Sequence, residues 1–190
     1  MIDIQELFVI LIIVMGIIGM VRGFLKELGV TLVLIATLFA LDRLIPIVNN
    51  FINGGGFGFL NLGPVPQTQT TDELLFVIFS AILVAATFIA YQGETLAFGG
   101  SNPKGIVGGL LGFLIGAVNG YLLFGTFWWV ANFYQYPFGL VAQPLPAGAQ
   151  QIVSSGVLPL ELLGGGPVDQ NTWGLLPFLL IFLVILRVIR

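Results

Sequence analysis

The chain has 190 residues, of which 57% are hydrophobic and 8% are charged, and its mean hydropathy is +1.06. An average soluble domain is about 25% charged, so too few polar residues are present to cover a soluble fold, and we expect an all-α integral membrane protein. The chain has no Cys and no His, which excludes thiolate nucleophiles, disulfides, iron–sulfur clusters and imidazole ligation of metal or haem. Its formal net charge of −3 argues against nucleic acid as a partner.

The first apolar segment, residues 4–21, is expected to be a retained membrane helix. It begins beside the acidic Asp3 and Glu6 and ends before Arg22. A secretory signal peptide would start with basic residues and end at a small-residue cleavage site, and this segment has neither feature.

The second apolar segment, residues 28–41, is short for a membrane span. We expect its helix to continue past Asp42 and Arg43 and to stop near Leu44, because Pro46 disfavours a helical residue before it. Asp42 and Arg43 would then lie at the depth of the lipid headgroups, with the arginine side chain extended outward.

Three further segments complete the predicted bundle: residues 74–91, 105–130 and 173–186, the last short and interrupted by Pro177. The predicted architecture is a compact bundle of about five transmembrane helices, with a four-helix core over residues 1–131 and a C-terminal helix over 173–190. Residues 132–172 are rich in Pro and Gly but remain apolar and have no basic residue. We expect them to lie along the outer membrane interface or against another protein.

The distribution of basic residues predicts the topology. With the N-terminus outside and the C-terminus cytoplasmic, nearly every basic residue falls on the cytoplasmic side, and Arg43 alone falls outside. The residues assigned to cytoplasmic turns and topology are Arg22, Gly23, Lys26, Glu27, Lys104, Arg187 and Arg190. Aromatic residues expected at the outer interface are Trp128, Trp129, Tyr134, Tyr136 and Trp173.

Glycines recur every four residues along the fourth segment, and positions four apart share one face of a helix. Small residues let membrane helices approach closely, so this face is expected to pack against another helix. The partner is a span of the same chain, a second copy, or a foreign subunit, and a pore lined by small residues is a further alternative. The predicted helix-packing residues are Gly105, Gly108, Gly109, Gly112, Gly116, Asn119 and Gly120.

The sequence has no clear set of residues for catalysis or for ion-coupled transport. None of the five predicted spans has an ionisable residue in its central part, as coupled transporters normally do. Glu27 is best explained as a charge at a helix N-terminus. We expect no enzyme activity, no metal site and no cofactor, although lipid or pigment could be held by apolar contact.

Three motifs resemble those of the CvpA family, named for colicin V production. They are the opening Ile2-Asp3-Ile4, the turn Arg22-Gly23-Phe24-Leu25-Lys26-Glu27, and Asn102-Pro103-Lys104-Gly105 before the glycine-rich helix. The resemblance covers about residues 1–130. It implies a small bacterial inner-membrane protein with four spans and no catalytic residue, and it places residues 132–172 and the fifth span outside the usual family pattern.

These observations predict a non-enzymatic multi-pass protein that acts as a structural or assembly subunit of a larger membrane complex through glycine-mediated packing. That complex would serve export or the envelope, or be bioenergetic, for example photosynthetic or respiratory. The alternative is a small oligomeric channel or a component of solute or toxin export. Expected partners are membrane lipids and other integral membrane subunits, with a homo-oligomer as an alternative.

Overall fold

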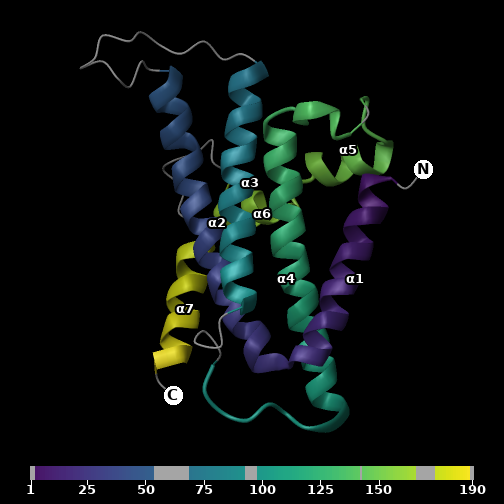
Figure 1. Cartoon of the computed structure of the whole chain (residues 1–190), viewed down its shortest axis with the longest axis vertical. Helices are drawn as coiled ribbons and strands as arrows, with labels where there is room; N and C mark the ends of the chain where they lie inside the picture. Colours follow the sequence, from purple (N-terminus) through teal and green to yellow (C-terminus); the bar gives the residue numbers. More distant parts are fainter. Residues whose placement is uncertain (1–2, 54–68, 93–97, 142, 166–173, 189–190) are drawn as a thin grey trace.

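The computed structural model describes residues 3–53, 69–92, 98–141, 143–165 and 174–188, and these form helices and connecting turns without any strand (Figure 1). Four helices are long and apolar enough to cross a membrane. They are α1 (Ile4–Arg22), α2 (Phe24–Asn53), α3 (Gln69–Gln92) and α4 (Gly105–Phe133). The all-helical multi-pass architecture is therefore confirmed, and α1, at about 28 Å, nearly matches the ~30 Å hydrocarbon layer.

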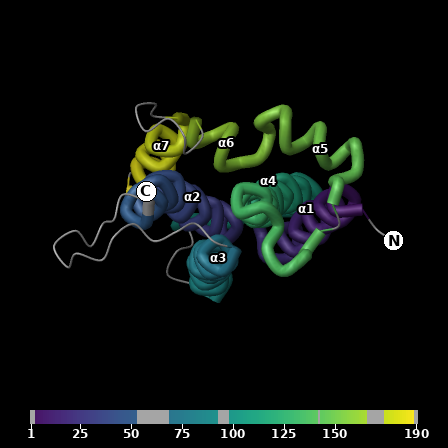
Figure 2. Tube along the Cα trace, turned by 90° about the horizontal axis from the view of Figure 1, so that it is seen from above, coloured from purple at the N-terminus to yellow at the C-terminus, as the bar shows by residue number. Residues whose placement is uncertain are grey.

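The four long helices run alternately up and down, and α4 packs against each of the others (Figure 1). Seen from above, α4 lies between α1 and α2, and α3 stands beside α2 (Figure 2). We call the end where α1 begins the Asp3 end of the bundle, and the opposite end, where α1 turns into α2, the Arg22 end. The central position of α4 explains why its glycines matter for the whole fold.

A single glycine makes the turn between α1 and α2. Gly23 has a φ of +92°, which favours glycine, and a Cβ there would lie 2.7 Å from the Asn102 side-chain nitrogen. Asn102 also accepts a hydrogen bond from the Leu25 backbone N–H at 3.0 Å. The segment before α4 is thereby attached to the first turn of α2.

Helix α2 differs from the sequence prediction, because it continues through Pro46 to Asn53. Asp42 is consequently well inside the helix, and its side chain is only 4% exposed. It pairs with Arg43 at 3.3 Å, and Gly164 packs against it. The expected end of the helix near Leu44 is wrong, and a later segment of the chain covers Asp42.

The chain after α4 folds back onto the bundle. A 3₁₀ turn, η3 (Pro137–Gly139), is followed by the short helices α5 (Ala147–Ser154) and α6 (Pro159–Gly164). Helix α5 lies near the start of α1, and α6 lies beside α2 and α4 between their two ends (Figures 1 and 2). Within residues 132–172, the described part therefore packs on the chain's own helices.

The last described helix, α7 (Leu176–Val188), packs along α2 and runs toward the Arg22 end (Figure 1). Its 13 residues give about 20 Å of helix, so it is shorter than the four candidate spans. A complete fifth crossing stays a prediction. Trp173 and Arg190 lie outside the described residues.

Candidate functional site: a buried polar cluster beside a lateral groove

The glycine face of α4 packs directly on α1. A Cβ on Gly112 would lie 2.5 Å from the Gly19 carbonyl oxygen, and one on Gly116 would lie 2.9 Å from the Gly19 Cα. At Gly120 the nearest atom is the Met15 Cβ, at 2.8 Å. Real Cβ contacts are longer than these distances, so the two backbones touch only because side chains are missing. The structure places this face against a span of the same chain.

The remaining glycines of the set have different surroundings. Gly108 packs on the Pro103 carbonyl of its own approach segment, and Gly109 would place a Cβ in ordinary contact with Met20. Gly105 has open space around it and a φ of +68°. Sequence reasoning missed the partner glycines on α1, Gly16 and Gly19, whose spacing within the first apolar segment was the available signal.

Glu27 is the centre of a buried polar cluster. Its side chain is fully buried, and its Oε1 lies 3.0 Å from Nη1 of Arg22. Its Oε2 accepts hydrogen bonds from the Tyr91 hydroxyl at 3.2 Å and from Nδ2 of Asn119 at 2.8 Å. One carboxylate therefore joins side chains from α1, α3 and α4 to α2.

The other members of the cluster also contact one another. The Arg22 guanidinium lies 4.3 Å from the centre of the Tyr91 ring and donates to the Tyr91 carbonyl at 3.1 Å. Asn119 is fully buried, its Nδ2 donates to the Glu27 carbonyl at 3.0 Å, and its Oδ1 accepts from the Thr31 hydroxyl at 2.7 Å. Buried polar groups are costly unless paired, and this cluster pairs them across all four long helices.

Glu27 corrects the sequence interpretation. It does lie in the first turn of α2, as a charge at a helix N-terminus would. However, α2 begins at Phe24, so Glu27 is inside the helix and buried rather than exposed in a turn. The expectation of no ionisable residue in the central part of the spans is not contradicted by Glu27, but its burial and its contacts with three other helices were not foreseen. Asn119, an amide in a long stretch without charge, was the signal for a polar partner at this depth.

The other predicted turn residues remain at the surface. Lys26 and Lys104 are exposed, and the Arg22 side chain is 24% exposed despite its ion pair. Arg187 is in the last turn of α7. The Arg22 end of the bundle therefore has exposed basic residues around the Glu27 carboxylate, which is ion-paired with Arg22.

The aromatic residues expected at an interface are buried within the protein. Trp128, Trp129, Tyr134 and Tyr136 are each 3–6% exposed. Trp128 donates from Nε1 to the Tyr136 hydroxyl at 3.0 Å, and Trp129 stacks on Phe133 with ring centres 4.9 Å apart. Burial raises the pKa of Tyr134 and of Tyr136, so both phenols stay neutral. These rings pack the end of α4 instead of forming a belt that faces lipid.

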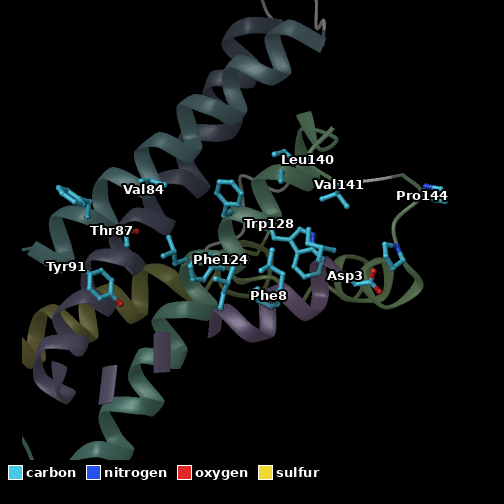
Figure 3. Close-up of a pocket in the computed structure, with 18 residues that line it drawn as sticks. Asp3, Phe8, Val84, Thr87, Tyr91, Phe124, Trp128, Leu140, Val141 and Pro144 are labelled. Atoms are coloured by element: carbon cyan, nitrogen blue, oxygen red, sulfur yellow. The ribbon is translucent and has the colours of Figure 1, made fainter. Parts of the chain in front are cut away.

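A lateral groove of about 940 Å³ opens between α1 and α3, with α4 as its floor (Figure 3). Leu140, Val141, Pro144 and Pro146 line it at the Asp3 end, and Tyr91 lines its other end. Its lining is almost entirely apolar, with Asp3, Thr87 and Tyr91 as the polar exceptions. The lining residues are Asp3, Ile4, Leu7, Phe8, Leu11, Val84, Thr87, Phe88, Tyr91, Leu123, Phe124, Phe127, Trp128, Ala131, Leu140, Val141, Pro144 and Pro146.

Comparison with known proteins identifies a family for most of the chain. The sequence model of the family described as Colicin V production protein matches residues 3–165. No curated protein and no solved structure matches the chain. The match extends past α4 to the end of α6, so the expectation that the proline-rich segment lies wholly outside the family pattern is wrong. The chain belongs to the Colicin V production protein (CvpA) family of membrane proteins.

Proposed function

We propose that this protein is a non-enzymatic subunit that helps to assemble a larger complex in the bacterial cytoplasmic membrane. The family description, Colicin V production protein, supports an export or envelope complex over a bioenergetic one. Four long apolar helices and a back-folded C-terminal segment support a compact membrane-embedded unit.

The charge of Glu27 is sealed inside the bundle, and this observation carries the proposal. Ion-coupled transporters expose an intramembrane charge to a pathway. Here Arg22, Tyr91 and Asn119 all donate hydrogen bonds to the Glu27 carboxylate. Of these three residues, only Tyr91 lines the groove. Such a cluster fixes the helices relative to one another, as a static subunit requires.

The glycine face of α4 is occupied by α1, so contact with other subunits would use another surface. The opposite face of α4 has an exposed apolar stripe with a spacing of four residues, and we assign the subunit contact to it. The stripe consists of Ile106, Leu110, Leu114 and Val118, which are 92%, 56%, 50% and 43% exposed.

Native mass spectrometry of the protein, extracted from its own membranes in mild detergent, tests this role. We expect heteromeric companions with the wild type and their loss with Leu114→Trp. Leu162→Trp on α6 is the matched control, because Leu162 is 53% exposed but lies outside the stripe. A wild-type protein without companions contradicts the assembly role, whereas companions that survive Leu114→Trp contradict the assigned surface.

The same experiment separates the alternative of a small oligomeric channel or export component. A closed homo-oligomer as the sole species, with solute or ion flux in reconstituted liposomes, would favour that alternative. Gly116→Leu does not test association between subunits, because Gly116 contacts α1 and its substitution would disturb the fold itself.

A further inference from the structure

The groove between α1 and α3 has the composition of a hydrocarbon site. Phe8, Phe124 and Trp128 line it, together with aliphatic side chains from α1 and α3 (Figure 3). Apart from Asp3 at one end, the polar side chains named above are already engaged: the Thr87 hydroxyl donates to the Leu83 carbonyl at 2.7 Å, and the Tyr91 hydroxyl donates to Glu27. The groove can therefore offer an occupant only apolar contacts along most of its length.

The groove opens sideways, toward the lipid. Leu7 on α1, and Val84 and Phe88 on α3, line the groove and are 47%, 56% and 60% exposed. These residues belong to candidate membrane spans. A chain in the bilayer could enter between α1 and α3 without first passing through water.

The groove runs along the bundle from Asp3 to Tyr91. Along α1 its lining extends from Ile4 to Leu11, which is about 10 Å of helical rise. On α3 the lining continues to Tyr91, whose carbonyl accepts a hydrogen bond from Arg22 at the opposite end of α1. Asp3 is the one charged side chain among the lining residues, so the headgroup of an occupant would lie beside Asp3 with its acyl chain directed toward Tyr91.

Charge at that end selects the headgroup. Asp3 lines the groove, and Glu6 is exposed one turn later on α1. The basic residues Arg22, Lys26 and Lys104 are at the opposite end of the bundle, and Arg43 is paired with Asp42 beside α6. Two carboxylates attract an ammonium group and repel a purely anionic headgroup.

We propose that the groove binds one acyl chain of a phospholipid whose headgroup has an ammonium group, with that group beside Asp3. This site is independent of the proposed assembly role, because the apolar stripe assigned to subunit contact is on a different part of α4. A bound lipid would fill the space that α1 and α3 leave over the C-terminal part of α4.

The test uses full-length protein reconstituted in vesicles of equal parts phosphatidylethanolamine and phosphatidylglycerol, then extracted and examined by native mass spectrometry. We expect one retained lipid, with phosphatidylethanolamine preferred about fivefold, as for one charge pair at a solvated site. Equal retention of the two lipids would overturn the headgroup assignment.

Two variants with a matched control locate the site. Val84→Trp fills the groove and should reduce the retained lipid about tenfold. Val77→Trp is the control, since Val77 is also on α3 and 48% exposed but does not line the groove. Equal retention by both variants would mean lipid bound elsewhere on the surface and would overturn the proposal.

Asp3→Asn tests the charge with little risk to the fold. Asp3 is the N-cap of α1, in a capping box with Glu6, and Asn is an equally good N-cap residue. We expect the variant to retain lipid while losing the preference for phosphatidylethanolamine. An unchanged preference would contradict the role of Asp3.

Discussion

Helices α1 and α4 are in close contact at the Arg22 end and diverge at the Asp3 end. At the first end, glycines on both helices bring the backbones together, with Gly19 between Gly112 and Gly116. At the second, Phe8 meets Trp128 edge-on with ring centres 5.3 Å apart, and the groove opens beside them. The size of the side chains along one helix pair thus decides which end is sealed and which end can admit a ligand.

Substituting a glycine of the sealed end should have the largest effect. In Gly116→Leu the new side chain would meet the Met15 carbonyl and the Gly19 backbone, which cannot move aside as a flexible side chain could. We expect a destabilisation of about 3 kcal/mol or more. Thermal unfolding of the purified protein, monitored by size-exclusion chromatography after heating, measures this destabilisation.

Gly109→Ala is the matched control for that variant. A Cβ at Gly109 meets only the Met20 side chain, at an ordinary 3.5 Å. Because Ala favours a helix by up to about 1 kcal/mol over Gly, this variant should be neutral or slightly more stable. A loss of stability equal to that of Gly116→Leu would show that the α1–α4 contact does not depend on backbone approach.

The polar cluster should give the next largest effect. Glu27→Gln leaves Arg22 without its carboxylate, and we expect a loss of about 2–3 kcal/mol, because Arg22 is partly buried. Combining it with Arg22→Gln should restore part of that loss. A double-mutant cycle by thermal unfolding measures the coupling, and strictly additive losses would contradict a paired cluster.

The smallest effect is expected at the open end. Trp128→Phe removes the hydrogen bond to Tyr136 and should cost about 1 kcal/mol. Trp129→Phe is the control, because Trp129 stacks on the Phe133 ring, a contact that Phe can also make. If Trp129→Phe is as destabilising as Trp128→Phe, the hydrogen bond does not stabilise this end.

The sequence predicted the four long helices because apolar segments of about 20 residues between charges are a strong signal. It also predicted Gly112, Gly116 and Gly120 as packing residues, since their spacing defines a helix face. It left the partner of that face open, because periodicity within one helix says nothing about which neighbour covers it. The answer required the position of Gly19 in space.

Other features depend on contacts between distant parts of the chain. Glu27 and Asn119 are 92 residues apart, so their pairing could not be seen in either local pattern. Asp42 is buried because α6 folds back over α2, and the groove exists because α1 and α3 leave part of α4 uncovered. Pro46 was misleading, since tertiary packing can retain a helix through a proline.

The absence of cysteine from the natural sequence permits a direct test of the sealed and open ends. Paired cysteines at Met20 and Gly109 would be close enough for a disulfide, whereas Leu7 and Val84 lie on opposite walls of the groove. Oxidation of each double variant in native membranes should cross-link the Met20→Cys/Gly109→Cys pair rapidly and the Leu7→Cys/Val84→Cys pair hardly at all. The reverse pattern would contradict the account of an α1–α4 contact that is sealed by glycines and a groove that remains open.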